Sequence, residues 1–181
     1  MAVQRAIESD PEEMDAPANN EDAVALKLDE FLPYQLAVVA SLVSQALSRV
    51  YARRYKIGVP EWRVLVTLGQ FGVLTGKAIG FRTLMHKTKV SRAVAVLEKR
   101  KLLVRKTNRA DMRESFISLT GAGLAMYEEL APHAVEFNRK LTEFLTPGDR
   151  EAFNRALQQI TDRSARLAEE TAEDGKPEGK A

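Results

Sequence analysis

The sequence predicts a mainly α-helical fold with a small β component, an α+β protein. Apolar side chains recur every three or four residues over 30–56, 121–145 and 147–168, as they do on one face of an amphipathic helix. Two short segments, 102–107 and 114–119, alternate in polarity and enclose the turn sequence NRADMR, which is typical of a β-hairpin. Long helices that flank a short helical region and one hairpin predict a winged helix-turn-helix joined to an all-helical part.

The first long helix, over 30–56, is followed by Gly58 and Pro60, which end one helix and begin the next. Its apolar stripe consists of Leu32, Leu36, Val39, Val43, Leu47 and Val50. Pro60 suits the first turn of the second helix, where Glu61 meets the positive end of the helix dipole. That helix, EWRVLVTLGQF, is nearly all apolar, so we expect it to be largely buried until Gly72 ends it.

Two shorter helices and the hairpin complete the central region. Thr75 is a candidate N-cap for a helix over about 76–83, and the next helix spans about 87–100. In the hairpin, the alternation of side chains places Ile117 and Leu119 toward the core.

The two C-terminal helices continue the amphipathic pattern. Thr120 is a candidate cap for the helix over 121–145, and Thr146-Pro147-Gly148-Asp149 resembles a capping box before a final helix over about 147–168. Together with the first helix, they carry more apolar surface than a central domain of about 60 residues covers, which predicts a homodimer. The alternative is a monomer in which the long helices fold back.

The predicted organisation has five parts. A disordered acidic tail (1–28) precedes a dimerisation helix (29–57), the winged helix-turn-helix DNA-binding domain (58–120) and two further dimerisation helices (121–168), and a second disordered acidic tail (169–181) follows. The two tails carry net charges of −5 and −3. Their acidic residues either compete with DNA for the basic face of the protein or only keep the chain soluble.

Positive charge is concentrated in one segment, although the whole chain carries only +2. Residues 77–113 contain twelve Lys or Arg against Glu98 and Asp111, a net charge of +10. Such a concentration is typical of a surface that binds a polyanion, and a helix beside a two-stranded ribbon fits the grooves of duplex DNA. RNA binding is disfavoured because the sequence lacks the aromatic stacking motifs of RNA-binding domains.

The helix over 87–100 supplies the residues best suited to reading bases. Its inward stripe consists of Val90, Val94 and Leu97. On the opposite face, Arg92 can contact guanine through two hydrogen bonds, and the hydroxyls of Thr88 and Ser91 can bond to several bases. The predicted DNA-binding residues are Lys77, Lys87, Thr88, Lys89, Ser91, Arg92, Arg109, Asp111 and Arg113. The alternative is an ordinary solvated helix face.

The hairpin turn carries a D-x-R sequence. Arg113 at its tip is suited to the minor groove, where the negative potential attracts guanidinium groups. Asp111 either holds Arg113 or Arg109 in position or forms only a local salt bridge in the turn. Phosphates repel the carboxylate, so we expect no direct contact between Asp111 and DNA.

The composition disfavours several other classes of protein. The chain has no cysteine, which excludes disulfides, thiolate metal sites and thiol redox sensing. His86 and His133 are far apart and have no acidic cluster at ligand spacing, so no metal site is expected. The sequence has no phosphate-binding glycine loop and no nucleophile motif, which argues against an enzyme, and no cofactor is expected. No apolar run is long enough to span a membrane, and no secretory signal pattern is present, so we expect a cytoplasmic protein.

The segments EWRVLVTL, HKTKVSRAVAVLEKRKLLVR, the D-x-R turn and ISLTGAG resemble the MarR family of bacterial transcription regulators, over about residues 30–168. The resemblance implies an obligate homodimer whose two winged domains straddle a pseudo-palindromic operator. By position, the recognition helix and wing motif of the family fall on Thr88, Lys89, Ser91, Arg92, Asp111 and Arg113. Lys101 departs from the family pattern because a Gly usually ends the helix there. His86 stands where an Asp or Ser cap is common; it is a modest cap, an exposed residue or a titratable phosphate contact.

Most members of that family are repressors that a small molecule, often an anionic aromatic compound, releases from DNA. The resemblance therefore implies an effector, which we expect to be an aromatic acid or its coenzyme A thioester, bound between the dimer helices and the winged domain. Candidate ligand-binding residues are Tyr34, Val39, Val43, Trp62, Arg63 and Leu65, although each also suits core packing. The alternatives are a constitutive or architectural DNA-binding protein without effector and a ligand-dependent activator.

Overall fold

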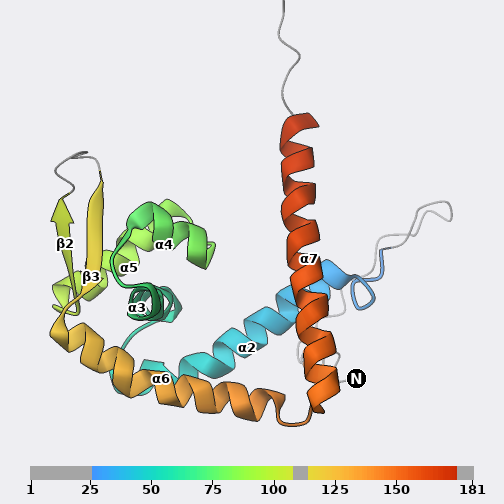
Figure 1. Ribbon diagram of the computed structural model, residues 1–181, viewed down its shortest axis with the longest axis horizontal. Helices are drawn as coiled ribbons and strands as arrows, with labels where there is room; N and C mark the ends of the chain where they lie inside the picture. Colours follow the sequence, from blue (N-terminus) through green and yellow to red (C-terminus); the bar gives the residue numbers. More distant parts are fainter. Residues whose placement is uncertain (1–25, 108–113, 175–181) are drawn as a thin grey trace, which may run out of the picture. The chain divides into compact units, whose positions relative to one another are not determined.

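A computed structural model describes residues 26–107 and 114–174 of the chain (Figure 1). Its elements are α2 (Leu32–Tyr55), α3 (Val59–Phe71), β1 (Leu74–Thr75), α4 (Gly76–Thr83), α5 (Lys87–Lys99), β2 (Leu103–Thr107), β3 (Ser115–Leu119), α6 (Gly121–Thr142) and α7 (Pro147–Asp174). The predicted mainly helical α+β class is confirmed. The chain divides into two compact units, Met1–Ala134 and Val135–Ala181.

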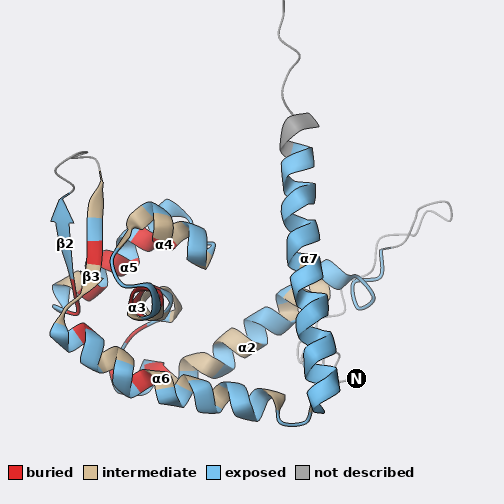
Figure 2. Ribbon diagram, in the orientation of Figure 1, coloured by how far each residue is buried: buried red, intermediate tan, exposed pale blue. Residues whose placement is uncertain are grey.

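Helix α3 lies at the centre of the first unit, in contact with α4, α5 and β3 (Figure 1). Its start is fixed by the carboxylate of Glu61, which accepts a hydrogen bond from the backbone N–H of Gly58 at 2.9 Å. Val64, Leu65 and Leu68 are at most 2% exposed, so the middle of this helix is buried as predicted, whereas Phe71 at its end is 44% exposed. Figure 2 shows that the buried segments gather on α3 and on the elements that surround it.

The β component is a three-stranded antiparallel sheet in the order β1-β3-β2. The predicted hairpin is present, with Arg105 opposite Ile117, and Ile117 is buried as expected. The third strand, β1, was not predicted because it is only two residues long, too short to show an alternating pattern. It pairs Leu74 with Ile117 and so ties the start of α4 to the hairpin.

The predicted helix caps are confirmed. The hydroxyl oxygens of Thr75 and Thr120 accept hydrogen bonds from the backbone N–H groups of Ala78 (3.2 Å) and Gly123 (3.1 Å). At the start of α7, the Thr146 hydroxyl accepts from the Asp149 N–H at 3.2 Å and donates to the Asp149 carboxylate at 2.6 Å. Side chains thus satisfy backbone donors that a helix start leaves unpaired.

The last helix is longer than predicted. It ends at Asp174 rather than near residue 168, so the first part of the predicted tail 169–181 is helical. Three of the six residues 169–174 are Glu, which is a good helix former, and this preference outweighs the acidic composition that led to the prediction of disorder. No helix in the described part of the chain is long and apolar enough to cross a membrane.

Candidate nucleic-acid interface

Helix α5 has one buried and one exposed face. Its buried side chains are Val90, Ala93, Val94 and Leu97, each at most 3% exposed. Its exposed side chains include Lys87, Thr88, Lys89, Ser91 and Arg92. The predicted amphipathic division of the helix is therefore confirmed. Among the described residues, no carboxylate forms an ion pair with Lys87, Lys89 or Arg92.

A tight turn between α4 and α5 sets the start of this helix. The backbone N–H of Met85 donates to the carbonyl oxygen of Gly80 at 3.2 Å, and Leu84 adopts a left-handed conformation with φ 52°. His86 is the N-cap of α5, because its Nδ1 accepts a hydrogen bond from the backbone N–H of Thr88 at 3.3 Å. Of the roles considered for His86, the structure shows the modest cap.

The end of α5 keeps the geometry that glycine usually provides. The N–H of Lys101 donates to the carbonyl of Glu98 (2.8 Å), and the N–H of Leu102 donates to the carbonyl of Leu97 (3.0 Å). These two bonds form a Schellman motif, whose left-handed residue is Lys101 with φ 60°. The departure from the family pattern at this position therefore leaves the helix end intact, at the cost of a strained backbone conformation.

Two residues of the basic segment have structural partners that charge counting did not reveal. The guanidinium of Arg100 donates to the carbonyl oxygens of Tyr55 and Lys56, at the end of α2. Arg105 forms an ion pair with Glu98, with 2.9 Å between Nε and Oε2. Arg100 is far in sequence from its two partners, and Arg105 and Glu98 lie on different elements, so no local pattern predicts these contacts. Arg100 and Arg105 are therefore engaged within the protein, and fewer Lys and Arg side chains of residues 77–113 are available to bind a polyanion.

The base of the hairpin is held close to α6. The hydroxyl of Thr120 donates to the carbonyl oxygen of Lys101 at 2.7 Å, and its backbone N–H donates to that of Leu102 at 3.0 Å. A Cβ atom at Gly123 would stand 1.8 Å from the Leu102 carbonyl oxygen, so only glycine allows this approach. The hairpin is thus anchored at its base to the helix that follows it.

The other predicted DNA-binding residues are less completely described. Lys77 is exposed in the first turn of α4, the helix that precedes α5. Arg109, Asp111 and Arg113 lie outside the described residues, because the structure leaves out 108–113. Arg82, on the same helix as Lys77, places its guanidinium carbon 3.9 Å from the centre of the Phe71 ring, a cation–π contact.

The structure places the six predicted ligand-binding residues in different surroundings. Leu65 is fully buried in the core and has no surface left for a ligand, so core packing accounts for it. Trp62 stacks on the buried Tyr51, with 4.9 Å between ring centres. Tyr34 and Val43 are half-buried and Val39 is exposed on α2.

Arg63 borders an open depression of about 360 Å³ between α2 and α3. Polar side chains of α2 that the sequence did not point to share it with Arg63: Ser41, Ser44, Gln45 and Ser48. The described residues contain no group of His, Asp or Glu side chains arranged to hold a metal ion.

Residues 55–114 match the family model of the MarR family. The fold is similar to a MarR family transcriptional regulator from Silicibacter pomeroyi (27% identity, TM-score 0.66, covering 76% of this chain and 91% of that one). It is also similar to MepR of S. aureus, solved in complex with DNA (22% identity, TM-score 0.67, covering 74% of this chain and 99% of that one). A third similar structure is BpsR of Bordetella bronchiseptica, whose DNA binding is regulated by 6-hydroxynicotinic acid (23% identity, TM-score 0.60, covering 70% of this chain and 98% of that one). A comparison with curated proteins gives no match. Residues 55–114 therefore resemble the MarR family, and the fold is similar to that of MarR family transcription regulators.

Proposed function

We propose that the protein is a homodimeric, sequence-specific DNA-binding regulator whose helix α5 enters the major groove. The observation that carries this proposal is the division of α5, because its apolar residues are buried while Lys87, Lys89 and Arg92 remain exposed and unpaired among the described residues. A helix fixed in this way presents its amino-terminal half to a groove without losing core contacts. The complex of MepR with DNA supports the assignment, since the two proteins share the fold.

Each exposed residue of α5 has a proposed role. Arg92 reads guanine through two hydrogen bonds, and Thr88 and Ser91 bond to neighbouring bases. Lys87 and Lys89, with Lys77 of α4, contact phosphates and contribute affinity that does not depend on sequence. In the wing, Arg113 is proposed to enter the minor groove, with Asp111 and Arg109 beside it in the turn.

Dimerisation is proposed because both units leave large apolar side chains exposed. On and before α2 these are Phe31, Leu32, Val39 and Leu42, between 40% and 47% exposed. In the second unit they are Val135, Leu141, Phe144, Phe153, Leu157 and Leu167, between 37% and 78% exposed. Apolar surface of this extent marks an interface. A symmetric dimer places two α5 helices on one face of the duplex and requires a pseudo-palindromic operator.

We further propose that the protein is a repressor that a small aromatic acid, or its coenzyme A thioester, releases from DNA. Arg63 beside the depression between α2 and α3 is suited to bind a carboxylate. The regulation of BpsR by 6-hydroxynicotinic acid supports this chemistry. A ligand that prefers one separation of the two recognition helices shifts the population away from the form that fits the operator.

Selection of binding sites from random duplexes tests the DNA-binding proposal. We expect enrichment of a pseudo-palindrome whose half-sites are one helical turn, roughly 10 base pairs, apart. Binding without any enriched sequence would contradict it and favour the architectural alternative.

Titration of the selected complex with 6-hydroxynicotinic acid and a panel of aromatic acids and thioesters tests the effector proposal. Arg63→Gln is expected to reduce the response. Arg53→Gln, at another exposed arginine, on α2, is expected to leave it unchanged. No release by any compound of the panel favours a regulator without an effector of this class.

A further inference from the structure

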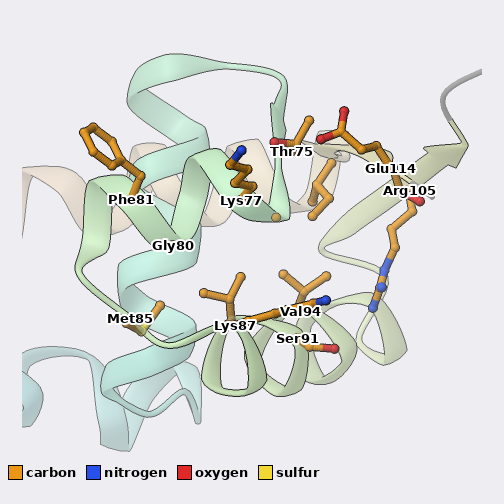
Figure 3. A pocket seen from close by; sticks show the side chains of 14 residues that line it. Thr75, Lys77, Gly80, Phe81, Met85, Lys87, Ser91, Val94, Arg105 and Glu114 are labelled. Atoms are coloured by element: carbon orange, nitrogen blue, oxygen red, sulfur yellow. The ribbon is translucent and has the colours of Figure 1, made fainter. Parts of the chain in front are cut away.

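A cavity of about 680 Å³ lies between α4, α5 and the sheet, on the side of α5 that carries Lys87 and Ser91 (Figure 3). Its floor is apolar, since Met85, Val90, Val94 and Ile117 line it and each is at most 7% exposed. Its rim is largely cationic, with Lys77, Lys87 and Arg105 around the opening. The cavity therefore combines an apolar floor with positive charge.

The charges at the rim are unequal. Arg105 is paired with Glu98, and a second carboxylate, Glu114, also lines the cavity, on the side of the sheet. Lys77 and Lys87 are exposed, and no carboxylate within 26–107 or 114–174 forms an ion pair with them. Anionic groups are therefore favoured near the α4 and α5 side of the opening. Phosphates of DNA satisfy such lysines but make no use of an apolar floor.

The amino-terminal segment of this chain has the complementary chemistry. Residues 1–25, which lie outside the described residues, contain seven acids against one arginine. Five of these acids fall in the sequence IESDPEEMD, residues 7–15, between or beside the apolar Ile7 and Met14. The ten residues 16–25 join this sequence to the described chain and span up to ~35 Å when extended. This reach is about the ~36 Å length of the 24-residue helix α2, so a nearly extended linker carries the acidic sequence along the length of that helix.

We propose that residues 7–15 dock in this cavity and compete with DNA for the face of α5. The acidic side chains lie against Lys77 and Lys87, and Ile7 or Met14 covers the apolar floor at Met85 and Val90. The docking itself needs only this chain, whereas its consequence rests on the proposed DNA-binding function. Because the apparent Kd is the intrinsic Kd divided by the competent fraction, a segment bound nine-tenths of the time weakens DNA binding about tenfold.

Two full-length variants with the same change in net charge test the proposal. The first carries Glu8→Gln, Asp10→Asn, Glu12→Gln, Glu13→Gln and Asp15→Asn. The matched control carries Glu169→Gln, Glu170→Gln, Glu173→Gln, Asp174→Asn and Glu178→Gln. The dissociation constant for a random-sequence duplex is measured at several salt concentrations. Methyl NMR of ¹³C-labelled methionine reports on Met85, which is 7% exposed at the floor of the cavity.

We expect the first variant to bind the duplex about tenfold more tightly than the natural chain and to shift the Met85 methyl resonance. The control is expected to leave this resonance in place and to change the affinity much less. An equal gain in affinity in both variants with an unmoved Met85 resonance overturns the proposal, because the tails then act only through net charge.

The remaining outcomes separate this proposal from the proposed function. If no protein binds DNA but Met85 shifts only in the first variant, the docking stands and the DNA-binding function fails. If the Met85 resonance is the same in all three proteins and moves only when 6-hydroxynicotinic acid is added, the cavity takes a free small anion and the docking proposal is wrong.

Discussion

The guanidinium of Arg100 donates a hydrogen bond to the carbonyl oxygen of Tyr55 at 2.8 Å and a second one to that of Lys56 at 3.0 Å. Arg100 is the C-cap of α5 and Tyr55 ends α2, so one side chain joins the proposed DNA-reading helix to the proposed dimerisation helix. Cations are favourable at the carboxyl end of a helix, where carbonyl groups are unpaired. This contact fixes the position of α5 relative to the end of α2.

Arg100→Gln is expected to lower the free energy of unfolding by about 1–2 kcal/mol, because two charge-assisted hydrogen bonds are lost at a partly exposed site. Urea unfolding measures the change. Lys99→Gln is the matched control, since Lys99 is exposed and has no ion pair among the described residues. Equal stability of the two variants would show that the contact between α5 and α2 contributes nothing.

Lys101→Gly is expected to raise the free energy of unfolding by about 0.5–1 kcal/mol. Lys101 has φ 60°, a conformation that glycine adopts without the steric conflict of a Cβ atom. Lys101→Ala keeps the Cβ atom and is expected to give no such gain. If thermal unfolding shows the same gain for both variants, removal of the lysine side chain, rather than backbone strain, is responsible.

Gly123→Ala is expected to destabilise the protein by about 3 kcal/mol, because the new methyl group would stand 1.8 Å from the Leu102 carbonyl oxygen. The backbone of the hairpin or of α6 must then move. Gly121→Ala, two residues earlier, is the control, since a Cβ atom there meets nothing within 4 Å. Denaturant unfolding of both variants checks the prediction, and a similar cost at the two positions would contradict it.

The alkaline limit of stability is expected to depend on two buried tyrosines. Burial raises the pKa of Tyr51 and of Tyr55 above the ordinary value of 10.0, and the nearby guanidiniums of Arg63 and Arg54 only partly oppose this. A raised folded-state pKa means that stability is fully present below pH 10 and is lost as the pH rises above it. The Tyr55 hydroxyl is also buried without a hydrogen bond of normal geometry in the described part of the chain, although the nearby Glu129 carboxylate raises the pKa of Tyr55 further.

Tyr55→Phe is therefore expected to move the midpoint of alkaline unfolding, followed by circular dichroism, to higher pH. The substitution also removes an unpaired buried hydroxyl, so stability at neutral pH should not fall. Tyr34→Phe, at a half-buried position of α2, is expected to leave the alkaline midpoint unchanged. An unchanged midpoint in Tyr55→Phe shows that this phenol does not limit stability at high pH.

Much of the fold was predictable because local patterns determine it. The spacing of Val90, Val94 and Leu97 gave the buried face of α5, and the caps at Thr75 and Thr120 fixed two helix starts. A two-residue strand such as β1 has no periodicity to detect. Gly123, inside the first turn of α6, is itself a sequence signal of close packing, here against the backbone of Leu102.

The candidate site was predictable only in part, because charge counting does not distinguish a free cation from a paired one. Arg100 and Arg105 have partners that only the folded chain brings near them. Among the predicted ligand-binding residues, Leu65 is fully buried and Trp62 stacks on Tyr51, whereas a role in ligand binding stays a prediction for the set. Apolar periodicity alone does not tell a lining residue from a packing residue.

The central claim is that α5 reads duplex DNA. Its most direct test is the affinity of two neighbouring variants for the selected operator and for other sequences, measured at several salt concentrations. Arg92→Ala is expected to lose about 1–3 kcal/mol on the selected operator and to discriminate less between it and other sequences. Lys89→Ala is expected to weaken binding to all sequences alike and to reduce the salt slope by about 1. Unchanged operator preference in Arg92→Ala together with an unchanged salt slope in Lys89→Ala would contradict the assignment of α5 as the DNA-reading helix.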